Sequence, residues 1–200
     1  MMFDRPLIFV WPDAIAFWAI LIWAYAMEAR QLQQKKQRSA GHEGADRYSG
    51  LVISIGTSLL QLGAVALAFY TPSAMPSEAR YPVYAAGLGL IVAGMLLRMH
   101  CWRELGAFFT HTVTIADDHR VVDGGAYRLL RHPSYLGALL TLMGLGLVLG
   151  NYASLMLMCI GSWSIYIYRI QVEEAALESA LGESYTRFKQ TRKRLIPYVY

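Results

Sequence analysis

The chain has 200 residues, of which 56% are apolar and 16% are charged, with a formal net charge of +4 and a mean hydropathy of +0.33. Soluble domains carry about 25% charged residues, so this composition excludes an ordinary soluble domain and favours a single helical membrane domain over residues 1–200. The basic residues flank apolar runs, which argues against a nucleic-acid partner. Cys101 and Cys159 provide neither a disulfide framework nor the spacing of a metal site.

Three apolar segments occupy the first half of the chain, at 7–27, 51–70 and 83–97. Each approaches the roughly 20 residues that a membrane-spanning helix needs. The first is too long for a cleaved signal peptide, and no basic region precedes it. Pro12 and Asp13 predict that its helix begins close to them. A polar loop at 28–49 and a Pro-containing turn at 71–82 are expected to separate the three helices.

The third apolar segment contains Gly87, Gly89 and Gly94. These glycines could be mistaken for a nucleotide-binding loop, but no strand precedes them and no phosphate-binding residues accompany them. We therefore predict that they allow two helices to pack closely.

The second half of the chain begins with a long polar loop, 98–134. Two short apolar runs follow, 135–149 and 152–168, and a Gly-Asn turn signal separates them. We interpret the two runs as a tight helical hairpin, because one continuous helix would be about twice the length that a bilayer requires. The charged tail that follows has helical periodicity, and we expect its Tyr185 and Phe188 to lie on the membrane surface.

The distribution of Lys and Arg predicts the orientation. Sixteen of the 18 lie in the 28–49 loop, the 98–134 loop and the tail, and the other two are Arg5 and Arg80. The positive-inside rule therefore places the long loop and the tail in the cytoplasm and the N-terminus outside. The predicted fold is an all-α integral membrane protein with five transmembrane helices, the last two forming the hairpin, in the plasma (inner) membrane if the source is bacterial.

The segment 131–135, Arg-His-Pro-Ser-Tyr, lies where the long loop meets the hairpin. Pro133 fits the first turn of a helix and favours an extended His132. Because a hairpin places its entrance beside its exit, this segment should face Arg169 and Glu173, which share one helix face. An interfacial belt and a weak intrahelical salt bridge are the alternatives. The convergence of Arg, Glu, His and Tyr at one membrane boundary favours a functional site.

Several motifs follow one another through this half of the chain: His119-Arg-Val-Val122, Gly124-Gly-Ala-Tyr127, Arg131-His-Pro-Ser-Tyr135, Arg169-x3-Glu173-Glu174 and Leu181-Gly-x2-Tyr185. The series resembles the isoprenylcysteine carboxyl methyltransferase family, within a broader group that includes phospholipid methyltransferases. The resemblance covers roughly residues 98–200, and the first two helices match only in being apolar. Arg-His-Pro-x-Tyr together with the downstream Arg-x3-Glu-Glu is more specific than either motif alone.

The resemblance implies a membrane enzyme that takes S-adenosyl-L-methionine from the cytosol, without a Rossmann domain, and a lipophilic acceptor from among the membrane lipids. Arg169 is the implied catalytic and acceptor-binding residue, and no metal is implied. Thr114 lies nearest to a position that is glutamine in many members, at a shorter spacing, and its contact stays open. The implied cofactor-binding residues are His119, Arg120, Val121, Val122, Tyr127, His132, Pro133, Ser134, Tyr135 and Glu173.

The chemistry is compatible with these residues. Methyl transfer to an ionised carboxylate needs no proton abstraction, and it depends on in-line positioning of the sulfonium, the methyl group and the oxygen. Arg169 can orient a carboxylate bidentately, and Glu173 suits the ammonium or the ribose hydroxyls of the cofactor. A carboxyl O-methyltransferase with a prenylcysteine-like acceptor is the first hypothesis. A phospholipid N-methyltransferase, a membrane NADPH-dependent reductase of related architecture and a non-enzymatic scaffold are the alternatives.

Overall fold

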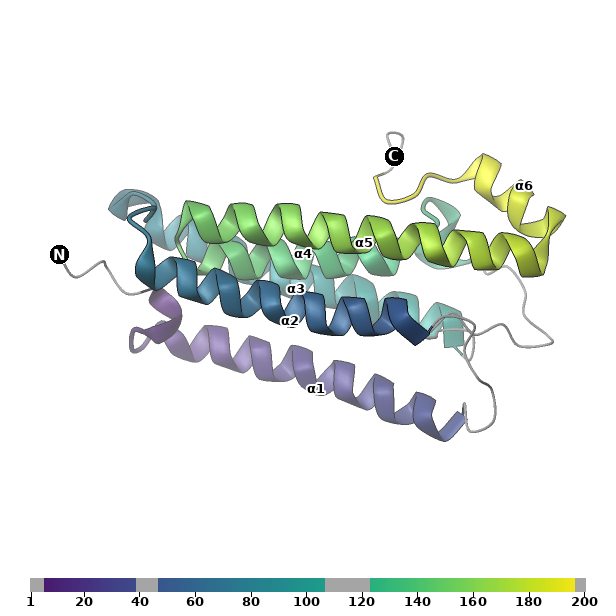
Figure 1. Ribbon diagram of the computed structural model, residues 1–200. Coiled ribbons are helices and arrows are strands. Elements are labelled where there is room, and N and C mark those ends of the chain that lie inside the picture. Colours follow the sequence, from purple (N-terminus) through teal and green to yellow (C-terminus); the bar gives the residue numbers. More distant parts are fainter. Residues whose placement is uncertain (1–5, 39–46, 107–122, 197–200) are drawn as a thin grey trace.

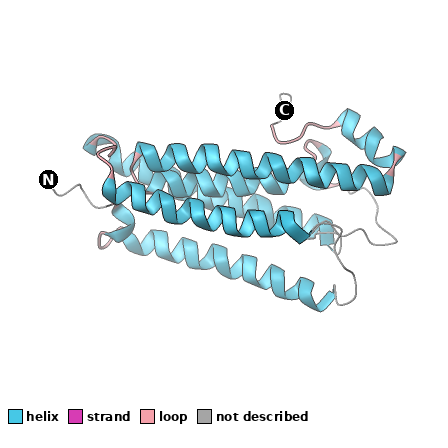
Figure 2. Ribbon diagram, in the orientation of Figure 1, coloured by secondary structure: helices cyan, strands magenta, loops and turns pink. Residues whose placement is uncertain are grey.

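The computed structural model describes residues 6–38, 47–106 and 123–196, and it describes side chains there except between 34 and 49. Helices α1 to α5 form an elongated bundle, and α6 folds back beside the end of α5 (Figure 1). Helices and loops make up the described ranges (Figure 2). The α-helices are α1 (Ala14–Arg38), α2 (Arg47–Tyr70), α3 (Arg80–Leu105), α4 (Pro133–Val148), α5 (Tyr152–Leu181) and α6 (Glu183–Thr191), and the short 3-10 helices are η1 (Leu7–Phe9), η2 (Ser77–Ala79) and η4 (Gly125–Arg128).

Helix α1 begins at Ala14, directly after Pro12 and Asp13, as the sequence predicted. The hydroxyl of Tyr84 donates to the carbonyl oxygen of Asp13 at 2.6 Å, which fixes this start against α3. The helix then continues to Arg38, so the prediction of a polar loop from residue 28 was wrong. Residues 28–38 are mostly Ala, Arg, Gln and Lys, which have high helix propensity, and the helix therefore outlasts the apolar segment.

Two further helices also extend beyond their apolar segments. Helix α3 reaches Leu105, so the predicted loop start at residue 98 was wrong and His100 and Glu104 are helical. Helix α5 runs from Tyr152 to Leu181 and joins the apolar run and much of the charged tail in one helix. Gly106 and Gly182 follow these two ends with φ of 52° and 54°. That backbone conformation favours glycine and ends a helix.

Three helices of the described ranges are long and apolar enough to cross a membrane, spanning 50–70, 77–105 and 152–181. Helix α4 is apolar but shorter. These lengths and compositions confirm the prediction of an all-helical membrane protein.

The backbones of α3 and α4 touch at two reciprocal glycine pairs. A Cβ added to Gly94 would lie 2.4 Å from the carbonyl oxygen of Gly137, and one added to Gly137 would lie 2.7 Å from that of Gly94. Gly87 and Gly144 repeat the arrangement at 2.9 and 2.6 Å, so the helices pack antiparallel. The prediction of close packing is confirmed for Gly87 and Gly94 and was wrong for Gly89, where an added Cβ meets nothing within 4 Å.

The turn between α4 and α5 pairs with the connection between α2 and α3. Met75 donates its backbone N–H to the carbonyl oxygen of Gly150, and Tyr152 donates to that of Ser73, both at 2.8 Å. Asn151 caps α5 by accepting from the backbone N–H of Ser154 at 3.0 Å. These bonds join the two connections at one end of the bundle. The start of α4 and the later turns of α5 therefore lie toward the other end.

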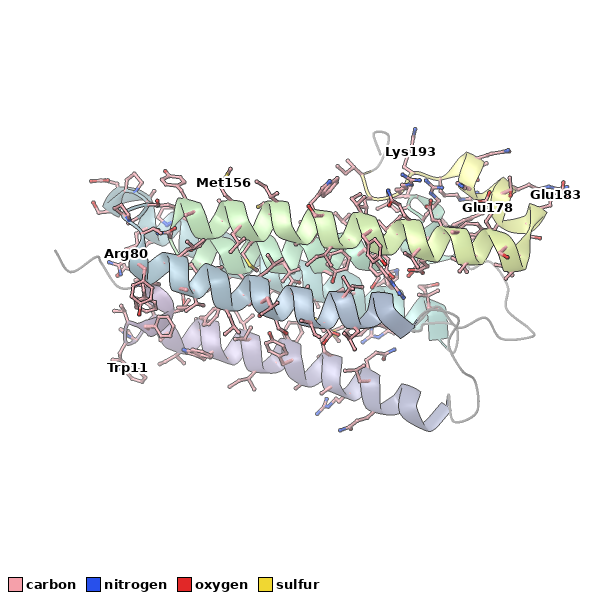
Figure 3. All side chains as sticks on the ribbon, in the orientation of Figure 1. Trp11, Arg80, Met156, Glu178, Glu183 and Lys193 are labelled. Carbon is pink, nitrogen blue, oxygen red and sulfur yellow. The ribbon has the colours of Figure 1, made fainter. Side chains whose placement is uncertain are left out.

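The labelled side chains distinguish the two ends of the bundle. Trp11 and Arg80 lie at one end, whereas Glu178, Glu183 and Lys193 lie at the other (Figure 3). The second group surrounds α6 and the tail, where many charged side chains gather (Figure 3). The motifs of the start of α4 and the later part of α5 therefore belong to this charged end.

The glycine contacts predict a selective effect of added methyl groups. Gly94→Ala and Gly137→Ala should each lower the free energy of unfolding by about 1–3 kcal/mol, because the methyl group would force the two backbones apart. Gly89→Ala is the matched control on the same helix and should leave stability unchanged or slightly higher. Thermal melting in detergent, followed by circular dichroism, measures the three variants; equal losses at Gly89 and Gly94 would contradict the assigned contact.

Candidate active site

The start of α4 is held by the C-terminal tail. His132 is the N-cap residue, and Pro133 takes the first helical position, as predicted. The extended conformation predicted for His132 was wrong, because its φ is −127° but its ψ is only 54°. The backbone N–H of Arg131 donates to the carbonyl oxygen of Lys193 at 2.8 Å, and that of His132 donates to the carbonyl oxygen of Arg194 at 3.1 Å. The tail thus lies parallel to this segment, a pairing that no sequence pattern indicated.

Tyr135, Arg169 and Glu173 form a cluster between α4 and α5. The Tyr135 hydroxyl donates to Oε2 of Glu173, and it accepts from Nε of Arg169 at 3.1 Å. Nε of Arg169 also lies 3.7 Å from Oε2 of Glu173, and Arg169 is only 1% exposed. The predicted juxtaposition of the hairpin entrance and exit is therefore confirmed. The intrahelical salt bridge also exists, as one side of a cluster that joins two helices.

Glu174 is the centre of a second cluster. Its Oε1 lies 3.1 Å from Nε2 of His132 and 3.2 Å from Nη1 of Arg131, and its Oε2 accepts from Nε of Arg194 at 3.2 Å. Glu174 is 3% exposed, so this carboxylate ties α5 to the start of α4 and to the tail within a buried environment. The sequence reasoning left Glu174 and Arg194 out of the site. The consecutive glutamates were the available signal, because neighbouring positions on a helix face different directions.

Arg98 links two further helices to the site. Its Nη2 lies 2.7 Å from Oε1 of Glu28 on α1, and its Nη1 donates to the carbonyl oxygen of Ser134 at 3.4 Å. The guanidinium lies over the ring of Trp102 at 5.2 Å. Both Arg98 and Glu28 were assigned to polar loops from sequence, and this buried pair was therefore missed.

The remaining predicted cofactor residues lie in different settings. His132 is buried and stacks on Tyr135, with ring centroids 5.4 Å apart. The Ser134 hydroxyl is buried and has no hydrogen-bond partner within the described part of the chain. Tyr127, on η4, is buried, and this burial raises the pKa of its hydroxyl well above the ordinary value, so it stays protonated. His119, Arg120, Val121 and Val122 lie outside the described residues, as does Thr114.

The expectation for Tyr185 and Phe188 was wrong. Their side chains are 3% and 8% exposed, so the apolar face of α6 packs against the protein, not against the membrane surface. The chain turns back at Gly182, and Nζ of Lys189 lies 3.0 Å from Oε2 of Glu178, which holds α6 beside the end of α5.

The fold and the site define an all-helical membrane protein whose buried ionic residues gather at one end of the bundle. The model of the isoprenylcysteine carboxyl methyltransferase (ICMT) family matches residues 87–179. This stretch contains α4, most of α3 and α5, and the residues of the two ionic clusters except Arg194. The resemblance to this family that the motifs predicted is confirmed, and the match begins within α3, earlier than the predicted residue 98.

Known relatives agree with the family match. A protein-S-isoprenylcysteine O-methyltransferase of Schizosaccharomyces pombe is 34% identical over 122 residues, which are 60% of this chain and 52% of that protein. A protein-S-isoprenylcysteine O-methyltransferase B of Arabidopsis thaliana is 32% identical over 115 residues, which are 56% of this chain and 58% of that protein. The chain thus spans about half the length of these curated relatives.

A solved structure extends the likeness to the fold. The eukaryotic intramembrane Ras methyltransferase ICMT (isoprenylcysteine carboxyl methyltransferase) superposes with a TM-score of 0.61 and 26% sequence identity. The superposition covers 74% of this chain and 52% of the ICMT chain. A methyltransferase family of this description implies the use of a methyl donor.

The buried Glu174 predicts a large stability effect. Glu174→Gln keeps the shape of the side chain but removes the buried negative charge that faces Arg131, His132 and Arg194. We expect the free energy of unfolding to fall by about 3 kcal/mol, as for other broken buried ion pairs.

Glu178→Gln is the matched control, one turn further along α5. Its carboxylate is 44% exposed and pairs with Lys189, so the loss should stay below about 1 kcal/mol. Thermal melting of both variants in detergent checks this order. A smaller loss for Glu174→Gln than for Glu178→Gln would show that Glu174 does not hold this end of the protein together.

Proposed function

We propose that the chain is a membrane methyltransferase that uses S-adenosyl-L-methionine to methylate the carboxylate of a lipophilic, prenylcysteine-like acceptor. The observation that carries the proposal is the cluster of Arg169, Tyr135 and Glu173, in which Arg169 is buried. It joins two motifs that are far apart in the sequence and lies in a chain that resembles isoprenylcysteine carboxyl methyltransferases.

Arg169 suits an acceptor carboxylate. Its guanidinium is a permanent cation with five N–H donors in a fixed plane, and Tyr135 accepts from Nε at 3.1 Å. That bond orients the plane of the guanidinium. An amine acceptor would place a second cation beside a buried one, so the site supports a carboxyl methyltransferase better than a phospholipid N-methyltransferase.

Polar side chains near Glu173 suit the binding of the cofactor. Glu173 offers a carboxylate to an ammonium or to ribose hydroxyls, and the Ser134 hydroxyl is buried without a partner in the described structure, as a ligand contact would be. His132, Pro133, Tyr127 and the motif 119–122 complete the proposed set of cofactor residues. When bound, the sulfonium would supply an electrophilic methyl group.

The residues position the reaction and transfer no proton. Arg169 would hold the acceptor carboxylate so that its oxygen faces the methyl group, and the donor would supply that methyl group, with the electron pair of the broken carbon–sulfur bond remaining on sulfur. The Tyr135 hydroxyl bonds both Arg169 and Glu173, so it couples the acceptor group to the donor group. Both charges disappear in the product, which a site shielded from water favours.

We also propose that helices α1 to α5 all cross the membrane, and that α4 and α5 form a hairpin within it. The concentration of Lys and Arg in residues 28–49, in residues 98–134 and in the tail supports a cytoplasmic C-terminus and an external N-terminus, in the plasma (inner) membrane if the source is bacterial. The cofactor would then enter from the cytosol and the acceptor from the bilayer.

Arg169→Ala should reduce methyl transfer to background while the affinity for the cofactor changes little, because only the acceptor contact is lost. Tritiated methyl transfer in detergent and calorimetry with S-adenosylhomocysteine measure the two effects. Arg187→Ala is the control, since Arg187 is 75% exposed and pairs with Glu183 on the surface of α6. Normal turnover of Arg169→Ala would remove this residue from the site.

The acceptor class is tested by offering a farnesylated cysteine, a fatty acid and an aminophospholipid to the same tritium assay. We expect a base-labile methyl ester on the prenylcysteine and no product on the amine. Preferential methylation of the aminophospholipid would reverse the assignment. Binding of NADPH without S-adenosylhomocysteine would favour a reductase, and binding of neither would favour a scaffold.

A further inference from the structure

The Arg98 side chain crosses from α3 to the start of α4. A Cβ added to Gly137 would lie 2.8 Å from Cγ of Arg98, so the glycine leaves room for the arginine side chain. Beyond it, Nη1 of Arg98 donates to the carbonyl oxygen of Ser134 at 3.4 Å, and Arg98 is 8% exposed. Arg98 therefore packs against the first turn of α4, which carries Ser134 and Tyr135 of the proposed site.

The same guanidinium is coupled to α5. Tyr166 interacts with Arg98 through its side chain, and the ring centroids of Tyr166 and Tyr135 are 5.3 Å apart. Tyr135 in turn bonds Arg169 and Glu173. A displacement of Arg98 would therefore reach Tyr135 by two routes, through the backbone of α4 and through the ring of Tyr166.

Glu28 of α1 determines where this guanidinium points. Its Oε1 lies 2.7 Å from Nη2 of Arg98, and the guanidinium lies over the ring of Trp102 at 5.2 Å. Ala24, one helical turn before Glu28, packs with Met95 and Trp102 in a buried cluster between α1 and α3. The backbone that carries Glu28 is thus held against α3. A carboxylate on a fixed helix restricts the long arginine side chain to one direction.

We propose that Glu28 is a positioning residue for the methyl transfer: by holding Arg98, it fixes the first turn of α4, and with it Tyr135, in the geometry that the reaction needs. The inference rests on the proposed function, and it adds α1 to the segments on which the reaction depends. The family model begins at residue 87, so Glu28 lies outside the matched range.

Glu28→Gln tests this role, because the amide keeps the shape of the side chain and removes the charge that holds Arg98. Tritiated methyl transfer in detergent gives kcat and KM, and calorimetry with S-adenosylhomocysteine counts the binding-competent molecules. We expect kcat per competent molecule to fall about tenfold or more, because small misplacements slow an in-line reaction strongly. The Kd of S-adenosylhomocysteine and the KM of the acceptor should change less than about threefold, since Glu28 acts through Arg98.

Three further variants complete the experiment. Glu28→Asp keeps the charge on a side chain that is one methylene shorter, and it should recover most of the lost kcat. Arg98→Gln should lose at least as much kcat as Glu28→Gln, and the double variant should lose no more than Arg98→Gln, because both changes remove the same contact. Arg30→Gln is the control, since Arg30 is an exposed residue of α1, and its kcat should equal that of the wild type.

The outcomes separate this inference from the proposed function. Unchanged kcat per competent molecule in Glu28→Gln, even with a lower melting temperature, would assign the pair a purely structural role and overturn the inference while the methyltransferase proposal stands. Additive losses in the double variant would also overturn it. If Glu28→Gln does not fold, Arg98→Lys replaces it, because lysine keeps the charge without the planar fork, and wild-type kcat in that variant would overturn the inference. If the wild-type protein transferred no methyl group, the proposed function and the inference would fail together.

Discussion

The polar end of the bundle depends on the two consecutive carboxylates of Glu173 and Glu174. Because they face different directions from α5, Glu173 meets Tyr135 and Arg169. Glu174 meets His132, Arg131 and Arg194. One turn of helix thus joins the start of α4 to the C-terminal tail. Buried ions of this kind are stable only when each carboxylate has its partners, so the two clusters also fix the relative positions of the three segments.

The apolar part of the bundle places these segments at the same end. The reciprocal glycine contacts bring the backbones of α3 and α4 together, and this brings Arg98 of α3 to the carbonyl oxygen of Ser134. Arg98 in turn holds Glu28 of α1. The turn between α4 and α5 is anchored at the opposite end by the α2–α3 connection. Contacts with α1, with α3 and with the α2–α3 connection therefore determine the position of α4 and α5, which provide most residues of the site.

Under the proposed function, the arrangement would allow a carboxylate to be methylated without an acid or a base. An anion and a sulfonium cation react to give two neutral products, so a buried site needs matching charges and correct orientation more than proton transfer. Arg169 and Glu173 have the two required signs, and Tyr135 bonds both. The chain spans about half the length of its curated relatives, and the region that it shares with the family model contains this cluster.

The sequence by itself determined the helical membrane class, the start of α1, the proline-capped start of α4 and the meeting of Tyr135 with Arg169 and Glu173. These features follow from local rules: apolar length, the fixed φ of proline and helical spacing. Tertiary structure alone decided that α3 continues past its apolar segment, that Tyr185 turns inward and that the tail pairs with Arg131 and His132. Hydropathy identifies the apolar segments that can contact lipid. Buried ion pairs and some helix ends depend instead on partners that are distant in the sequence.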